Sequence, residues 1–181
     1  MKKNIVQFVC FETNLEFEKF IVNWEHYAKK FESKEVKTNL LEQVNTKNKF
    51  KYVSQHMAPQ DELQFTFMKE KKSVILPESK IKVVQAGGYK PIQMESSHHE
   101  DPNATKILLF LAKSEYDIAP YKKLAYQALN IYEAYFESCN YSYILEFFVN
   151  EEAGEELIKE LKSTLHNPEI GMYKECVVVE G

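Results

Sequence analysis

The pattern of apolar and polar positions predicts a strand followed by an amphipathic helix at the start of the chain. Residues 4–12 are rich in Ile, Val and Phe, which is typical of a buried strand. Residues 13–16 have the T-x-x-E spacing of a helix capping box. Over residues 17–31 the apolar side chains recur at helical spacing and form one face. We therefore predict a helix that packs on the first strand, and a short second helix over residues 36–46.

The rest of the first half has the pattern of antiparallel β-structure. Strands are predicted over residues 50–57 and 63–69, because apolar residues there are concentrated or alternate with polar ones. Two further apolar runs flank Gly87-Gly88. Because glycine readily adopts a positive φ, this pair predicts the turn of a β-hairpin.

The same order of elements begins again after the polar residues 97–105. We predict a strand over 106–112, a helix over 117–138, a strand over 142–149, a helix over 151–165 and a strand over 170–179. This repetition divides the chain of 181 residues into a first module at 1–96, a linker at 97–105 and a second module at 106–181.

The predicted elements indicate an α+β protein with a mainly antiparallel sheet and helices on one face. Each half resembles an incomplete ferredoxin-like module of the βαββαβ type. Together the two fused modules resemble the dimeric α+β barrel superfamily, which includes the antibiotic-biosynthesis-monooxygenase-like proteins. The local resemblance is greatest over residues 142–179, where a strand ending in Asn-Glu-Glu leads into a helix and a final strand.

The resemblance implies a small organic ligand in a cavity between sheet and helices, and chemistry of the cofactor-free oxygenase or isomerase type. Haem-degrading members of the superfamily use an Asn, a Trp and a His in the barrel cavity. Here Trp24 is predicted on a helix, and no His follows it at the matching place. We therefore transfer no catalytic residue from the family, and we expect no cofactor.

Aromatic residues are the candidates for contacts with such a ligand. The chain has 12 Phe, 11 Tyr and 1 Trp. Tyrosine and tryptophan combine an apolar body with a polar tip, which suits a pocket for a flat organic molecule. We select Trp24, Tyr27, Tyr132 and Tyr135 as ligand-binding candidates. Packing in a core or in a subunit interface is the commoner role of such residues, and the ligand pocket stays open beside it.

Metal-ligating residue types are concentrated in one segment, Ser97-His98-His99-Glu100-Asp101. His98, His99 and Asp101 are candidate ligands for a divalent metal, since imidazole and carboxylate suit such ions. Adjacent histidines on an extended segment project in opposite directions, so a closed site would need further ligands. The alternative is a solvated loop between modules.

Charge and composition narrow the classes of function. All 23 basic residues are lysines and the net charge is −4, which argues against a nucleic-acid-binding protein. No apolar run approaches the roughly 20 residues of a membrane span, and no secretory signal is evident, so we expect a cytoplasmic protein. Nucleotide-binding and hydrolase motifs are absent, which leaves open whether the protein is an enzyme. The alternative function is a non-catalytic module that forms a homodimer through sheet faces or edges.

Overall fold

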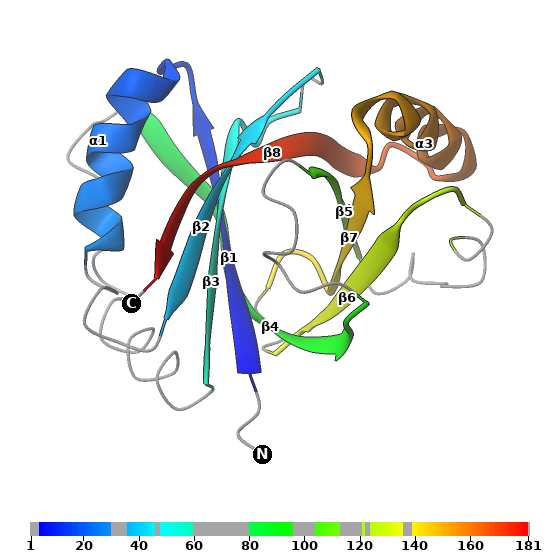
Figure 1. Ribbon diagram of the computed structural model, residues 1–181, viewed down its shortest axis with the longest axis horizontal. Coiled ribbons are helices and arrows are strands. Elements are labelled where there is room, and N and C mark those ends of the chain that lie inside the picture. The colour runs from blue at the N-terminus through cyan, green and yellow to red at the C-terminus, as the bar shows by residue number, and fades with distance from the viewer. Residues whose placement is uncertain are drawn as a thin grey trace.

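The computed structural model contains a closed barrel of eight strands, with helices on its outside (Figure 1). The structure describes residues 4–29, 36–45, 48–59, 80–95, 104–112, 121, 124–135 and 139–180. The elements in chain order are β1 (Asn4–Thr13), α1 (Phe17–Ala28), β2 (Lys37–Gln43), β3 (Tyr52–Pro59), β4 (Ile81–Gln93), β5 (Thr105–Leu111), β6 (Ala128–Ala134), β7 (Tyr143–Val149), α3 (Glu151–Thr164) and β8 (Glu169–Glu180).

Each half of the chain contributes four neighbouring strands to the barrel. The order around the barrel is β1-β3-β2-β8-β5-β7-β6-β4, and each neighbouring pair is antiparallel. The first half therefore has the order β4-β1-β3-β2, and the second half has the corresponding order β8-β5-β7-β6. The halves join where β2 pairs with β8 and where β4 pairs with β6. The predicted α+β class and antiparallel sheet are confirmed.

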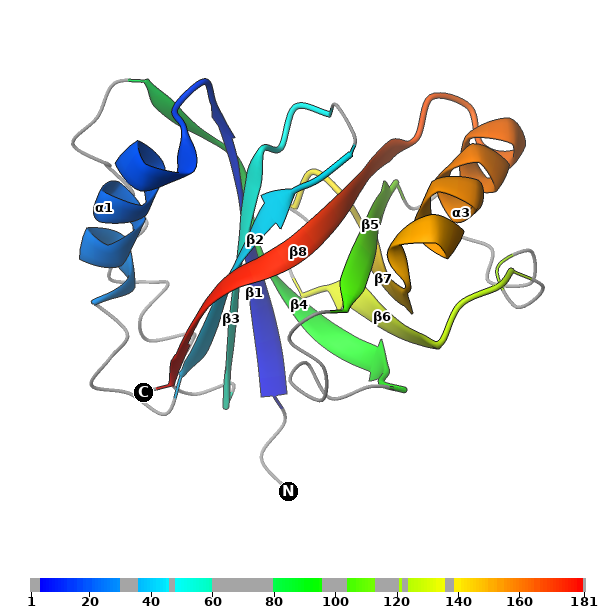
Figure 2. The same cartoon turned by 45° about the horizontal axis from the view of Figure 1, so that its top comes forward.

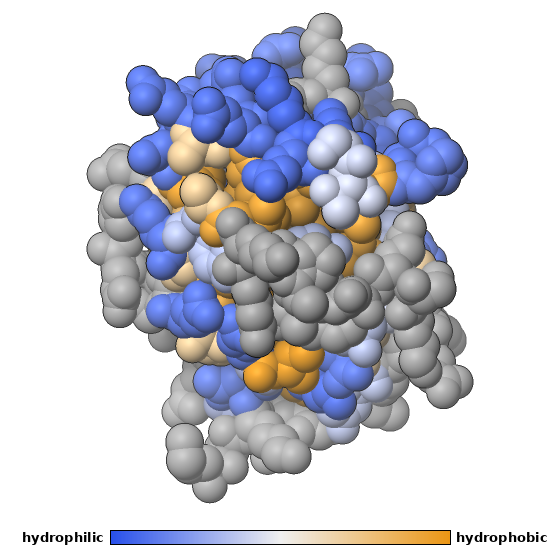
Figure 3. Space-filling model, turned by 90° about the vertical axis from the view of Figure 1, so that its right-hand side faces the viewer, coloured by the Kyte–Doolittle hydropathy of each residue, from blue (hydrophilic) through white to orange (hydrophobic). Residues whose placement is uncertain are grey.

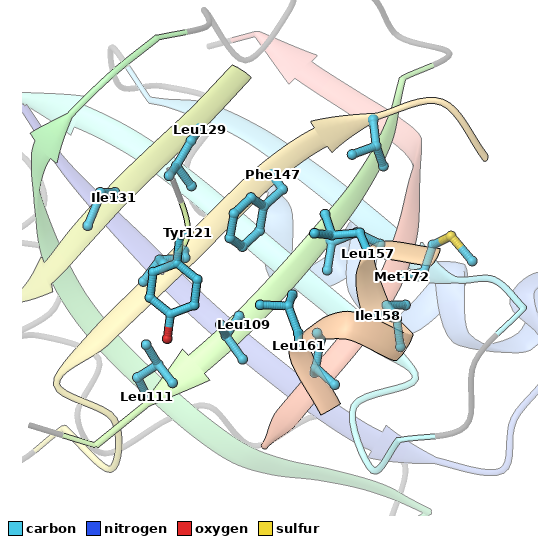
Figure 4. Close-up of a cluster of buried hydrophobic side chains, with 14 residues drawn as sticks. Leu109, Leu111, Tyr121, Leu129, Ile131, Phe147, Leu157, Ile158, Leu161 and Met172 are labelled. Carbon is cyan, nitrogen blue, oxygen red and sulfur yellow. The ribbon is translucent and has the colours of Figure 1, made fainter. Parts of the chain in front are cut away.

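The two described helices lie on opposite sides of the barrel (Figures 1 and 2). Trp24 of α1 is fully buried in an apolar cluster with the outward-facing side chains of the first half. On the other side, Leu157, Ile158 and Leu161 of α3 pack with side chains of β5, β6 and β7 (Figure 4). In both layers, where the resemblance implied a ligand cavity, side chains of the described residues pack between the helix and the sheet.

Local sequence explains where these helices begin. The side chain of Asn150 accepts a hydrogen bond of 2.8 Å from the backbone N–H of Ala153, which is a regular N-cap for α3. The predicted capping box before α1 does not form. Glu16 is the N-cap and its side chain makes no capping bond, while the Thr13 hydroxyl instead accepts from the N–H of Leu15 at 3.1 Å.

Three predicted elements differ from the structure. Residues 37–43 form strand β2 instead of a helix, and residues 128–134 form strand β6 inside the predicted helix 117–138. The expected hairpin at Gly87-Gly88 is part of the continuous strand β4, and neither glycine has a positive φ. The predicted strand over 63–69 and most of the linker lie outside the described residues.

A glycine–tyrosine pair occurs once in each half, at corresponding positions on β4 and β8. Gly87 precedes Tyr89 by two residues, and Gly171 precedes Tyr173 by two residues. A Cβ atom on either glycine would approach the ring of its tyrosine, at 3.1 and 2.6 Å. The Tyr89 hydroxyl donates at 3.0 Å to the backbone carbonyl of the residue two positions before β7. The Tyr173 hydroxyl donates at 2.9 Å to the backbone carbonyl of the residue two positions before β3.

Neither described helix has the length and apolar character that crossing a membrane requires.

Candidate functional site in the barrel interior

The inside of the barrel holds a buried group of polar side chains, which we call the interior polar cluster. Directly opposed residues of antiparallel neighbours project to the same face, so the strand register places these side chains together. The rest of the interior is apolar and aromatic, as in the contact of Phe8 with Tyr132 at 5.1 Å between ring centroids. The cluster consists of Asn39, Gln55, Lys106, Asn130, Tyr132, Glu146 and Glu175.

Glu146 on β7 is the centre of the cluster and is fully buried. Its Oε2 accepts a hydrogen bond of 2.8 Å from the Tyr132 hydroxyl and one of 3.3 Å from Asn130 Nδ2. Its Oε1 accepts from Gln55 Nε2 at 3.0 Å. Burial and the neighbouring Glu146 raise the pKa of Tyr132 well above its usual value, so the hydroxyl stays protonated and donates at neutral pH.

Lys106 on β5 is the cation of the cluster. Its Nζ lies 3.3 Å from Glu175 Oε2 and 3.7 Å from Glu146 Oε1. It also lies 5.4 Å from the centroid of the Phe148 ring, within range of a cation–π contact. The side chains of Lys106, Glu146 and Glu175 are at most 3% exposed, so two carboxylates share one ammonium group away from water.

Three oxygen atoms of the described residues are buried without a hydrogen-bond partner, and all three belong to this cluster. They are Asn39 Oδ1, Gln55 Oε1 and Glu175 Oε1. Their strands β2, β3 and β8 are consecutive around the barrel, and Asn39 stands directly opposite Gln55. A buried acceptor without a donor costs about 1–3 kcal/mol, so three of them in one place indicate a site for a molecule that supplies donors.

The structure does not bring the four predicted ligand-binding residues together. Trp24 and Tyr27 are buried between α1 and the outer surface of the barrel. Tyr132 lies inside the barrel, and Tyr135 follows β6 and is 37% exposed. Of the four, Tyr132 belongs to the interior polar cluster. The predicted metal ligands His98, His99 and Asp101 lie outside the described residues.

Trp24 takes part in a separate polar network beneath α1. Its Nε1 donates to Ser54 Oγ at 3.0 Å. His56 lies between two hydroxyls, with Nε2 3.0 Å from Ser54 Oγ and Nδ1 3.0 Å from Thr38 Oγ1. Complete burial lowers the pKa of His56 to about 3, so its ring is neutral at pH 7. The order of a hydroxyl, a histidine and a second hydroxyl resembles a nucleophile–base pair, but a sealed helix–sheet layer gives substrate no access, and we assign the network to stability.

A shallow acidic groove runs along α3, on the side of the molecule shown in Figure 3. It has a volume of about 490 Å³ and is lined by Asn45, Glu151, Glu152, Glu155, Glu156 and Lys159. Glu151 is already paired, because it accepts from Lys174 Nζ at 2.6 Å and from Asn45 Nδ2 at 2.7 Å. Exposed carboxylates of one helix do not need a ligand, so this groove is a solvated surface.

The sequence prediction missed most of the interior polar cluster, although one signal was available. Glu146 is the single charged residue within the apolar strand segment Tyr143–Val149. A charge that interrupts such a strand has no solvated face to occupy once both faces of the strand are covered, so it needs buried partners. Asn39 and Gln55 had no comparable signal, because amides are common on exposed strand faces.

No protein-family model matches this chain, and the curated proteins contain no match in sequence. Solved structures do match it. A mutant chlorite dismutase from Candidatus Nitrospira defluvii has a TM-score of 0.59 at 9% identity, covering 96% of this chain and 93% of that chain. The same enzyme in complex with imidazole has a TM-score of 0.57 at 10% identity, covering 96% and 92%. The protein named "Putative monooxygenase" from Fusobacterium nucleatum has a TM-score of 0.52 at 10% identity, covering 98% and 94%. These likenesses show that the chain has an α+β barrel fold shared with these proteins.

The expectation of no cofactor is contradicted by the likeness to chlorite dismutase. A dismutation is a redox reaction, and enzymes generally use a bound metal or organic cofactor for such chemistry. That enzyme was also solved with imidazole, a typical metal ligand. The expectation failed because it rested on the resemblance to cofactor-free enzymes and on the mismatch at Trp24, whereas a barrel can assemble a cofactor site from residues scattered over several strands.

Haem, which the resemblance implies for some members of the superfamily, finds no suitable axial ligand in His26, His56 or Cys10. A haem iron needs an axial ligand such as His, Met, Tyr or a Cys thiolate at a cavity. His56 has both ring nitrogens at hydroxyls beneath α1, and His26 is exposed on the helix. Inside the barrel, burial raises the pKa of Cys10 far above neutral pH, which keeps it a thiol. Across the described ranges there is also no group of three His, Cys, Asp or Glu that could hold a metal ion.

Proposed function

We propose that the protein binds a small molecule inside its barrel, at the interior polar cluster. The observation that carries this proposal is the set of three unpaired buried acceptors beside Lys106 and Glu146. Nearly all buried polar groups in proteins have a partner, and a ligand that donates hydrogen bonds supplies the missing ones here. This moves the proposed site from the helix–sheet layer, where the sequence placed it, to the centre of the barrel.

We further propose that the protein carries out a reaction of the oxygenase type on this ligand. The fold shared with the protein named "Putative monooxygenase" and with chlorite dismutase supports this, since both names denote enzymes that act on small molecules. One fold hosts many reactions, so assays with the identified ligand measure which reaction takes place.

The repeated strand order supports the interpretation of the barrel as two fused ferredoxin-like modules, with a boundary near residues 97–105. Register adds support at the level of residues. Asn39 faces Gln55 in the first half as Asn130 faces Glu146 in the second. The side chains of Gln55 and Glu146 then meet across the barrel through a 3.0 Å hydrogen bond. We propose that the cluster is the place where two equivalent modules share one binding site.

Binding is tested by screening the purified protein against small anionic, cationic and neutral molecules, with the thermal unfolding midpoint as readout. We expect at least one class to raise the midpoint of the wild type in a saturable way. The same compound should have little effect on Asn39→Leu, which removes one unpaired acceptor. A matched control is Asn45→Leu at the exposed groove of α3, which should respond like the wild type. If no class stabilises the protein, or if Asn39→Leu responds fully, the interior site is refuted.

The alternative function is a module that forms a homodimer through the faces or the edges of its sheet, and the described barrel argues against the edges. Each of the eight strands has a neighbour on both sides, so the described barrel offers no edge for pairing. Dimerisation through faces stays a prediction, and sedimentation of the purified protein measures it.

A further inference from the structure

Among the described residues, the interior polar cluster holds two carboxylates and one ammonium group, besides its unpaired acceptors. Lys106 contributes one positive charge, while Glu146 and Glu175 contribute two negative charges, and all three side chains are at most 3% exposed. A buried charge that is not balanced is costly, by several kcal/mol per ion after relaxation. The next lysine on the same face of β2 is Lys37, which is half-buried and stands opposite Glu180 in the register.

The two carboxylates are not equally satisfied. Both oxygens of Glu146 accept hydrogen bonds, from Tyr132, Asn130 and Gln55. Glu175 has one oxygen at Lys106, and its Oε1 has no donor among the described residues. At Glu175, an oxygen without a donor therefore belongs to a carboxylate that shares its ammonium partner with Glu146.

The other two unpaired acceptors lie on the neighbouring strands and are neutral amide oxygens. Asn39 is on β2, which pairs with β8 next to Glu175, and Gln55 is on β3 opposite Asn39. Gln55 already uses its Nε2 to donate to Glu146, which leaves its oxygen on the acceptor side. A carboxylate and two amide oxygens are acceptors only, so their common partner has to be a donor.

We propose that this cluster binds a small ammonium cation through Glu175, Asn39 and Gln55. This inference rests on the proposed function and specifies the class of its ligand. An –NH₃⁺ group or an ammonium ion supplies one positive charge and at least three N–H donors, which matches the Glu175 carboxylate and the three unpaired acceptors. Charge-assisted hydrogen bonds to such a group are stronger than neutral ones. Lys106 holds the second carboxylate and leaves Glu175 Oε1 to the ligand.

The experiment measures the thermal midpoint of the dialysed protein in chloride salts of ammonium, methylammonium, tetramethylammonium, sodium and potassium at equal ionic strength. Ammonium and methylammonium distinguish a free ion from the head group of a primary amine. Tetramethylammonium has the charge without N–H donors. We expect a saturable increase of roughly 3–6 °C at ten times the Kd for a donor-bearing cation. Sodium, potassium and tetramethylammonium should lack it.

Variants assign the effect to the cluster. Glu175→Gln removes the charge and keeps the shape, and it should weaken ammonium binding at least ten-fold. Glu155→Gln, an exposed carboxylate on α3, is the matched control and should bind as the wild type does. If Glu175→Gln does not fold, Asn39→Leu replaces it, with an expected loss of several-fold.

The outcomes separate this inference from the proposed function. Equal stabilisation by potassium or tetramethylammonium overturns the ammonium assignment, because donors are then unnecessary. An unchanged midpoint in ammonium, together with stabilisation by an anionic or neutral compound that Asn39→Leu abolishes, refutes the ammonium class and keeps the interior site. No stabilisation by any compound refutes both.

Discussion

Replacement of Lys106 by methionine should destabilise the protein far more than the same replacement of a lysine in an exposed ion pair, even where the N–O distance of the exposed pair is shorter. Lys106 lies 3.3 Å from Glu175 and 3.7 Å from Glu146, with all three side chains almost completely buried. Removing the cation takes away the ammonium group that both buried carboxylates contact. Breaking a buried pair in this way costs about 3–5 kcal/mol. Urea unfolding at pH 7, followed by tryptophan fluorescence of Trp24, measures the loss.

The control is Lys174→Met. Lys174 lies only 2.6 Å from Glu151, but the two side chains are 43% and 47% exposed. We expect this variant to lose at most about 1 kcal/mol, since solvent screens the pair. The double variant Lys106→Met/Glu175→Gln should recover part of the loss, because it leaves one buried carboxylate in the cluster instead of two. If Lys106→Met and Lys174→Met lose the same amount, or if the double variant is less stable than Lys106→Met, the electrostatic account is wrong.

Three further perturbations test the layers around the cluster. Folding lowers the pKa of His56 to about 3 from a value near 6.5 in the unfolded chain. Because the unfolded chain therefore binds the proton first, the stability of the protein falls as the pH falls. We expect chemical denaturation to show a loss of roughly 3 kcal/mol between pH 7 and pH 4, and a smaller loss for His56→Gln. Trp24→Phe removes the donor to Ser54 and should cost about 1–3 kcal/mol by the same assay. Gly171→Ala places a Cβ against the Asn48 side-chain amide and 2.6 Å from the Tyr173 ring, and we expect a lower thermal midpoint with about 1–3 kcal/mol lost.

Each of these has an outcome that contradicts it. An acid profile of His56→Gln identical to that of the wild type would show that the imidazole does not control acid stability. A neutral Trp24→Phe would mean that Ser54 finds another donor. For the glycine, the comparison is Gly154→Ala on α3, whose Cβ meets the flexible end of Met172 and gains helix propensity. If this variant is as destabilised as Gly171→Ala, the close approach of Tyr173 is not the cause.

The sequence predicted those elements that have one apolar and one polar side, or that are apolar throughout. Strand β1 and helices α1 and α3 were recovered within a few residues. Strands β2 and β6 were interpreted as helical because closure of the barrel buries both of their faces. In β2, Leu40 points toward the α1 layer and Leu41 points into the barrel, so apolar residues occur at neighbouring positions and no alternation is visible.

The binding site escaped prediction for a different reason. Its acceptors come from strands that are distant in sequence, as Asn39 on β2 and Glu175 on β8 illustrate. Which polar residues share the interior depends on register, and a shift of one residue would turn each of them outward. At Gly87-Gly88 a turn was inferred from the conformational freedom of glycine. The structure instead needs a residue without a Cβ there, because a Cβ on Gly87 would lie too close to Tyr89.

The two strand pairings that join the halves of the barrel, β2–β8 and β4–β6, also affect how the chain folds. Strand β2 pairs with β8, which follows the other described strands in the sequence, and β4 pairs with the later strand β6. During synthesis the amino-terminal half therefore presents two open strand edges, which are sites of intermolecular pairing until the remainder arrives. Pairings between such remote segments fold slowly. Truncation from the carboxyl end should accordingly yield insoluble material well before it removes any residue of the first four strands.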